Sequence, residues 1–139
     1  MVRRDAKIAR LSQVPMFSAC TRKELAIVAQ RMDELDLAAG EPLVREGDVG
    51  HEFYIIVDGK ATVSRGGREL ATLGPGDFFG ELALLDGHRR NATVTSATPL
   101  DVLCVGQQEF AALLSDLPQL SRKLLTGMAR RLHELDSRV

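Results

Sequence analysis

The segment 76–94 holds the residues best suited to binding a small ligand. Residues 81–85 are good helix formers between two glycines, and they predict one short helix. The first N–H groups of a helix attract anions, and Gly80 just before them lets a ligand approach the backbone closely. Arg90 follows Glu81 by nine residues, and its guanidinium is suited to hold two oxygens of one phosphate.

Glu81 stands at the start of the same predicted helix, where its carboxylate would repel a phosphate. Its position is explained if it accepts a hydrogen bond from a neutral donor such as a sugar hydroxyl. Together, Glu81 and Arg90 suit a phosphate fused to a ribose that has a free 2′-hydroxyl. The alternative is that the two form a partly buried ion pair that ties the helix to the following strand.

Two ordered blocks of sequence resemble the cyclic nucleotide-binding domain family. The first is E-G-D at 46–48 followed by F-Y-I-I-V-D-G at 53–59. The second is F-G-E-L-A-L-L at 79–85 followed by R-N-A-T-V at 90–94, which is similar to the family's phosphate-binding cassette. The resemblance covers about residues 12–135. It implies a β-roll that binds cAMP or cGMP, as in catabolite-activator-type regulators, protein kinase A regulatory subunits and cyclic-nucleotide-gated channels.

The resemblance assigns a role to individual positions. It implies that Glu81 accepts a hydrogen bond from the ribose 2′-hydroxyl and that Arg90 clamps the phosphate. The other positions that it assigns supply backbone groups or apolar contacts to the ligand: Gly80, Leu82, Ala83, Ala92, Val63 and Leu73.

Two residues beside the predicted clamp depart from the family pattern. Arg89 replaces a frequent proline, which leaves two adjacent arginines, and the A-T-V run at 92–94 favours Arg90 as the clamp. Asn91 is a predicted ligand-site residue at a position where the family usually has Ser, Thr or Ala. Because this side chain influences the phosphate contacts and the base preference, the choice between cAMP and cGMP stays open.

The sequence contains no arrangement typical of catalysis or metal binding. It lacks a nucleophile elbow, a Walker loop and zinc-ligand spacing, and its three histidines stand on separate segments. We expect no catalytic residue, no metal site and no cofactor, only a cyclic nucleotide ligand. Cys20 and Cys104 lie too far apart for a redox or metal motif, which indicates reduced thiols in a cytoplasmic protein.

The function predicted from these residues is a non-catalytic sensor that transmits ligand binding through its C-terminal helix to a partner or output domain. Three alternatives remain. The chain hydrolyses the cyclic nucleotide, it is a degenerate family member that acts only through protein contacts, or it is a fragment of a catabolite-activator-type transcription regulator without its DNA-binding domain.

The elements that must position the site fall into three parts of one predicted domain over residues 1–139. The N-terminal part is helical, with a T-x-x-E capping pattern at Thr21. From about residue 32 to 106, glycine and aspartate separate short β-prone runs, which is typical of an antiparallel β-roll or jelly roll. The predicted runs are 35–38, 42–45, 53–57, 60–65, 69–73, 92–97 and 100–105.

Two dipeptides, Asp58-Gly59 and Gly66-Gly67, suit two-residue hairpin turns because such turns need positive φ. Helices are predicted over 107–114 and 119–139, the C-terminal helical part 107–139. The expected fold is therefore mainly β with flanking helices: an N-terminal helical segment, the β-roll with its short phosphate-binding helix, and a long C-terminal helix.

Composition and charge limit the partners of the chain. Apolar residues make up 45% and charged residues 27%, and no apolar run approaches the ~20 residues that span a bilayer, so we expect no membrane partner. The segments 1–10 and 119–139 each carry a net charge of +3, whereas 11–118 carries −7. An acidic body with no Trp argues against direct nucleic-acid binding.

The last predicted helix carries two apolar rows. One row has the 3-4-3-4 spacing of a coiled-coil seam: Leu125, Met128, Leu132, Leu135 and Val139. The other is suited to packing on the β-roll: Leu117, Leu120 and Leu124. The pattern predicts a homodimer through this helix. The alternative is that all of these residues pack within one chain.

Overall fold

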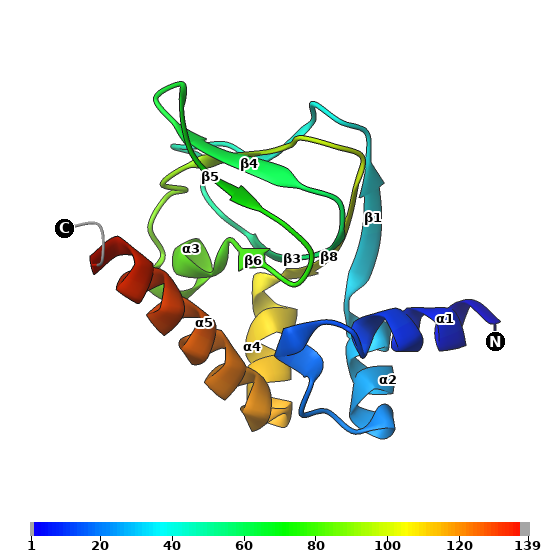
Figure 1. Ribbon diagram of the computed structural model, residues 1–139. Helices are drawn as coiled ribbons and strands as arrows, with labels where there is room; N and C mark the ends of the chain where they lie inside the picture. The colour runs from blue at the N-terminus through cyan, green and yellow to red at the C-terminus, as the bar shows by residue number, and fades with distance from the viewer. Residues whose placement is uncertain (1, 137–139) are drawn as a thin grey trace.

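Two four-stranded antiparallel sheets form the body of the protein in the computed structural model, which describes residues 2–136 (Figure 1). The first sheet has the order β1 (Asp33–Leu37), β8 (Leu100–Gly106), β3 (Glu52–Asp58) and β6 (Phe78–Phe79). The second has the order β2 (Pro42–Val44), β7 (Thr93–Ser96), β4 (Ala61–Arg65) and β5 (Arg68–Leu73). The predicted β-roll is confirmed.

The strand β3 separates two hydrophobic clusters. Phe53 and Ile55 face a cluster shared with the helices, whereas Tyr54 and Ile56 face a cluster between the two sheets. Side chains alternate between the faces of a strand, so a strand that is covered on both faces is a continuous apolar run. This placement explains the apolar segment 53–57.

One of the two predicted hairpin turns is present: Gly66 and Gly67, with φ values of 58° and 77°, join the paired strands β4 and β5. The hairpin predicted at Asp58-Gly59 is wrong, because this connection leads from β3 in the first sheet to β4 in the second, and the two strands do not pair. Gly59 does have the positive φ expected from the sequence, 92°. A Cβ atom on Gly59 would also lie 2.3 Å from the carbonyl oxygen of Pro99. Glycine is needed at position 59 both for its backbone conformation and for this close approach.

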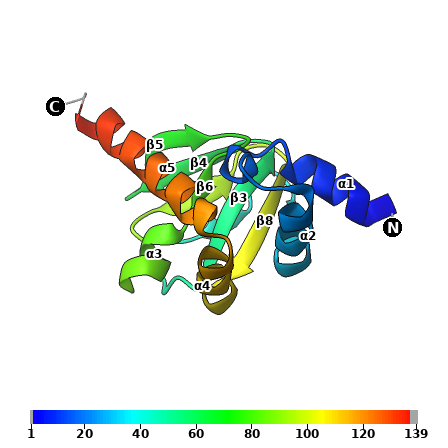
Figure 2. The same ribbon diagram turned by 90° about the horizontal axis from the view of Figure 1, so that it is seen from below.

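The helices cover the outer face of the first sheet (Figures 1 and 2). The N-terminal part contains α1 (Val2–Leu11), the 3₁₀ helix η1 (Pro15–Phe17) and α2 (Arg22–Arg31). The predicted capping box at the start of α2 forms, because Thr21 Oγ1 accepts from Glu24 N at 3.1 Å and Glu24 Oε1 accepts from Thr21 N at 2.8 Å.

The C-terminal helices are α4 (Gln107–Asp116) and α5 (Pro118–Asp136). The break that the sequence predicts between them lies at Leu117, and Pro118 begins α5, where its missing N–H costs no hydrogen bond. The row of Leu117, Leu120 and Leu124 is buried, as expected. Residues 137–139 of the predicted helix lie outside the described residues.

The segment between β5 and β7 contains β6 and the short helix α3 (Glu81–Asp86). The sequence predicts α3 but not β6, which pairs Phe78 with Ile55 and Phe79 with Tyr54. A strand of two residues is too short for a period-two pattern to be visible. β6 is nevertheless the element that attaches α3 to the first sheet.

Candidate ligand-binding site

Arg90 is held at its backbone by the E-G-D run at 46–48 and at its side chain by the carbonyls of Gly80 and Glu52. Its N–H donates to the carbonyl of Asp48 at 2.7 Å, and its carbonyl accepts from Gly47 N at 2.8 Å. The guanidinium Nη1 donates to the carbonyl of Gly80 at 3.0 Å, and Nη2 donates to the carbonyl of Glu52 at 2.7 Å. The side chain is 8% exposed, and this burial lowers the pKa of Arg90.

Two glycines make the space that the Arg90 guanidinium occupies. A Cβ atom on Gly50 would lie 2.7 Å from Arg90 Cζ and 2.6 Å from the Cβ of Ala83. Gly80 has a φ of 93°, and a Cβ atom there would lie 2.7 Å from Arg90 Nη1. Any larger residue at either position would displace the arginine, so these glycines fix where the guanidinium lies.

The neighbours of Arg90 lie in different surroundings. Arg89 is exposed, and its Nη1 donates to the carbonyl of Gly47 at 3.0 Å. Asn91 is also exposed, and its backbone carbonyl accepts from Arg65 Nε at 2.7 Å. Of the two adjacent arginines, only Arg90 is directed into the protein beside α3, which supports the register inferred from the sequence.

Glu81 is the first residue of α3, and its side chain is 3% exposed. Its Oε1 forms an ion pair with Arg131 Nη1 of α5 at 2.7 Å, so the ion-pair partner is Arg131 and not the Arg90 considered as the alternative. Within residues 2–136, Oε2 is buried without a hydrogen-bond partner. Burial raises the pKa of Glu81, and the positive charge of Arg131 acts in the opposite direction.

Arg131 links α5 to both β6 and α3. Its Nη2 donates to the carbonyl of Phe78, and its guanidinium lies 4.5 Å from the centroid of the Phe78 ring. Sequence analysis did not identify Arg131 as a site residue, because it lies 50 residues after Glu81 and belongs to no local motif. Gly50, Phe78 and the Glu52 carbonyl are further contributors that it missed.

The remaining predicted positions differ in their exposure and in the elements that carry them. Ala83 and Ala92 are buried, whereas Leu82 is 44% exposed. Val63 and Leu73 are partly buried on β4 and β5 and pack against the cluster between the sheets. Val63 pairs with Val94, four residues after Arg90. Across residues 2–136, no three His, Cys, Asp or Glu side chains are grouped to hold a metal ion.

The β-roll thus holds the buried carboxylate of Glu81 in its short helix α3 and the buried guanidinium of Arg90 beside that helix. The sequence profile of the cyclic nucleotide-binding domain matches residues 34–116. The protein belongs to this family, as the motifs predicted.

Three similar proteins illustrate the range of the family. A "cAMP-dependent protein kinase regulatory subunit" of Hypocrea atroviridis is 32% identical over 127 residues, which are 91% of this chain and 28% of that protein. The "Cyclic AMP receptor protein" of Thermus thermophilus is also 32% identical, over 88% of this chain and 59% of that protein. A solved structure of PKAR CBD2 bound to Sp-2Cl-cAMPS has a TM-score of 0.79 and 28% identity, covering 97% of this chain and 92% of that one.

The chain therefore spans less than two thirds of the length of the two curated relatives.

Proposed function

We propose that this protein is a non-catalytic sensor that binds cAMP or cGMP and signals through α5. The observation that carries the proposal is the Glu81–Arg131 contact, because it joins the predicted ribose-binding carboxylate to the C-terminal helix at 2.7 Å. Contact of a ligand with Glu81 would then shift the position of α5, and the position of α5 would in turn affect the affinity for the ligand.

The chemistry of the two buried charged groups supports a cyclic nucleotide. Arg90 uses two of its five guanidinium N–H groups on backbone carbonyls, and an arginine fork is suited to a phosphate. The Oε2 atom of Glu81 is a buried acceptor without a partner among the described residues, and such an atom costs free energy until a donor reaches it. A ribose 2′-hydroxyl is a donor of the required kind.

We further propose that the partner of α5 is a second copy of the chain. On α5, Leu125 is 63% exposed and Leu132 is 62% exposed, as expected for two positions of an unpaired seam. Met128, the predicted seam position between them, is instead partly buried and packs against the core cluster that the helices share. The side chains of Leu135 and Val139, which complete the seam in the sequence, lie outside the described residues. Whether the signal passes to an output domain in a longer protein or to a separate protein depends on the full reading frame.

The remaining parts of the proposal concern location and excluded partners. We place the protein in the cytoplasm and assign it no direct contact with nucleic acid or membrane. None of the helices within residues 2–136 is both long enough and apolar enough to cross a bilayer. The acidic segment 11–118, with its net charge of −7, disfavours contact with a phosphate backbone.

Calorimetric titration of the protein with cAMP, cGMP and 5′-AMP tests the proposal. We expect one of the two cyclic nucleotides to bind at one site per chain. At a concentration 100 times its dissociation constant, this nucleotide should raise the free energy of unfolding by about 2.7 kcal/mol, and the melting temperature should rise accordingly. Incubation of the complex with Mg²⁺ or Mn²⁺ should yield no AMP. Failure of both cyclic nucleotides to bind would favour a degenerate interaction domain, and release of AMP would favour an enzyme.

A further inference from the structure

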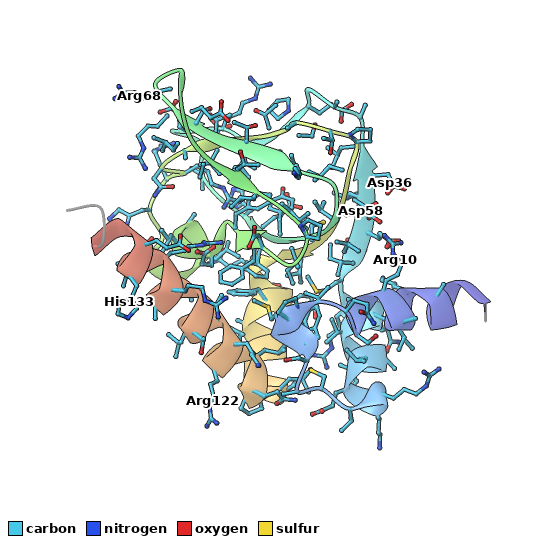
Figure 3. The ribbon with its side chains drawn as sticks, viewed as in Figure 1. Arg10, Asp36, Asp58, Arg68, Arg122 and His133 are labelled. Carbon is cyan, nitrogen blue, oxygen red and sulfur yellow. The ribbon has the colours of Figure 1, made fainter. Side chains whose placement is uncertain are left out.

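The inward face of α5 changes character where the helix passes the ligand site. Leu120 and Leu124 of α5 are buried in the core together with Leu117, which lies just before the helix, and the same 3-4 spacing continues to Gly127 and Arg131. In Figures 1 and 2, this half of α5 passes β6 and α3. Figure 3 shows Arg122 and His133 of α5 directed away from the β-roll. The row of leucines is thus replaced by a glycine and an arginine on the face that meets the site.

Gly127 lies directly against the ring of Phe78. A Cβ atom on Gly127 would be 2.5 Å from Cε2 and 2.7 Å from Cζ of that ring, closer than any side-chain contact allows. The ring has little room to move away, because it is buried, its centroid is 5.7 Å from that of Phe53, and Arg131 covers it at 4.5 Å. α5 can therefore occupy its present position only with glycine at residue 127.

We propose that Gly127 is a positioning residue that seats α5 against Phe78 and thereby brings Arg131 to Glu81. Arg131 is one helical turn beyond Gly127 on the same face, so both residues meet the Phe78 ring from α5. This inference rests on the proposed function where it concerns the nucleotide. Where it concerns the position of α5, it is independent of any ligand.

Substitution of Gly127 by alanine has opposite effects on the contact of α5 with Phe78 and on the stability of the α5 helix itself. Alanine is a better helix former than glycine, so the substitution strengthens α5 wherever the helix is free of contacts. In the seated helix, the added methyl collides with Phe78. Gly127→Ala therefore favours a helix that is intact but displaced. Thr126→Ala is the matched control, because Thr126 is exposed on α5 and also gains helix propensity without meeting Phe78.

Hydrogen exchange without nucleotide tests the seating alone. We expect the amides of α3 and β6 to exchange about tenfold faster in Gly127→Ala than in the wild type, which corresponds to about 1.4 kcal/mol. Thr126→Ala should exchange like the wild type. Equal exchange in the wild type and in Gly127→Ala would overturn the seating proposal, whatever the protein binds.

Binding tests the consequence for the site. We expect Gly127→Ala to bind the preferred cyclic nucleotide about tenfold more weakly and to discriminate less against its 2′-deoxy form, because Arg131 no longer orients Glu81. Adding Phe78→Leu to Gly127→Ala should restore part of the affinity, because the smaller leucine makes room for the added methyl group. Two substitutions with unrelated effects would not compensate each other in this way. Unchanged or tighter binding by Gly127→Ala, or a further loss in the double variant, would refute the proposal. Absence of binding by the wild type would instead refute the proposed function.

Discussion

Replacing Arg90 by leucine should remove most of the affinity for a cyclic nucleotide. A hydrogen bond to a charged group contributes about 1.5–3 kcal/mol, so loss of a two-pronged phosphate contact costs about 3–6 kcal/mol. This corresponds to a dissociation constant higher by about 10²–10⁴-fold. Arg90→Lys keeps the charge but cannot reproduce the planar fork, so its affinity should fall between those of the wild type and Arg90→Leu.

The same substitution should also lower stability, because Arg90 has a structural role. Its guanidinium satisfies the carbonyls of Gly80 and Glu52 at 3.0 and 2.7 Å. An acceptor left unsatisfied in a buried position costs about 1–3 kcal/mol, and removal of a buried charge offsets part of that loss. We expect Arg90→Leu to fold, with a free energy of unfolding lower by about 1–3 kcal/mol.

The two effects can be measured separately. Titration calorimetry gives the affinity, and denaturant unfolding without nucleotide gives the stability. Arg89→Leu is the matched control, because it removes the same charge at an exposed neighbouring side chain and should bind like the wild type. Wild-type affinity in a folded Arg90→Leu, or an equal loss in Arg89→Leu, would show that Arg90 is not the phosphate clamp.

Three further predictions concern Glu81 and α5. The wild type should prefer cAMP or cGMP over the 2′-deoxy form by about 5- to 150-fold, because a buried acceptor without a donor costs about 1–3 kcal/mol. Glu81→Ala should abolish this preference. Equal affinity of the wild type for both forms would argue against a ribose contact. Burial raises the pKa of Glu81 above its ordinary value of 4.5, so its contribution to stability is complete below that pH and is lost as the pH rises through the native pKa. The unfolding free energy of the wild type should therefore fall relative to that of Glu81→Gln as the pH rises from the ordinary carboxyl pKa through the raised native pKa, and a constant difference would contradict the burial argument. Sedimentation should show a wild-type dimer and a monomeric Leu125→Glu, Leu132→Glu double variant, in which both replaced side chains are exposed. A wild type that stays monomeric at high concentration with and without nucleotide would refute the seam.

Local patterns in the sequence were enough to predict most elements of the fold. The hairpin turn at Gly66-Gly67, the positive φ of Gly59, the capping box at Thr21 and the short helix after Gly80 all depend on residues within a few positions of one another. Backbone conformation and hydrogen bonding decide such features over short distances, so they are visible in the chain itself. The hairpin predicted at Asp58-Gly59 failed because the sheet that a strand joins is decided by distant strands. β6 escaped prediction because two residues carry no periodic signal.

The candidate site was only partly visible for the same reason. Glu81 and Arg90 stand in a family motif, and both are buried, Glu81 as the first residue of α3 and Arg90 beside that helix. Their surroundings come from elsewhere: Gly50 and the Glu52 carbonyl reach Arg90 from about forty residues earlier, and Arg131 reaches Glu81 from 50 residues later. The sequence names the two charged groups but not the groups that hold them.

The amphipathic pattern of α5 illustrates the limit. The sequence by itself determined that this segment is a helix with a buried row at Leu117, Leu120 and Leu124. Only the tertiary structure decided that the row continues into the ligand site, where Gly127 meets Phe78 and Arg131 meets Glu81. Side-chain periodicity sets which face of a helix is turned inward, whereas the atoms that this face contacts depend on how distant elements pack together.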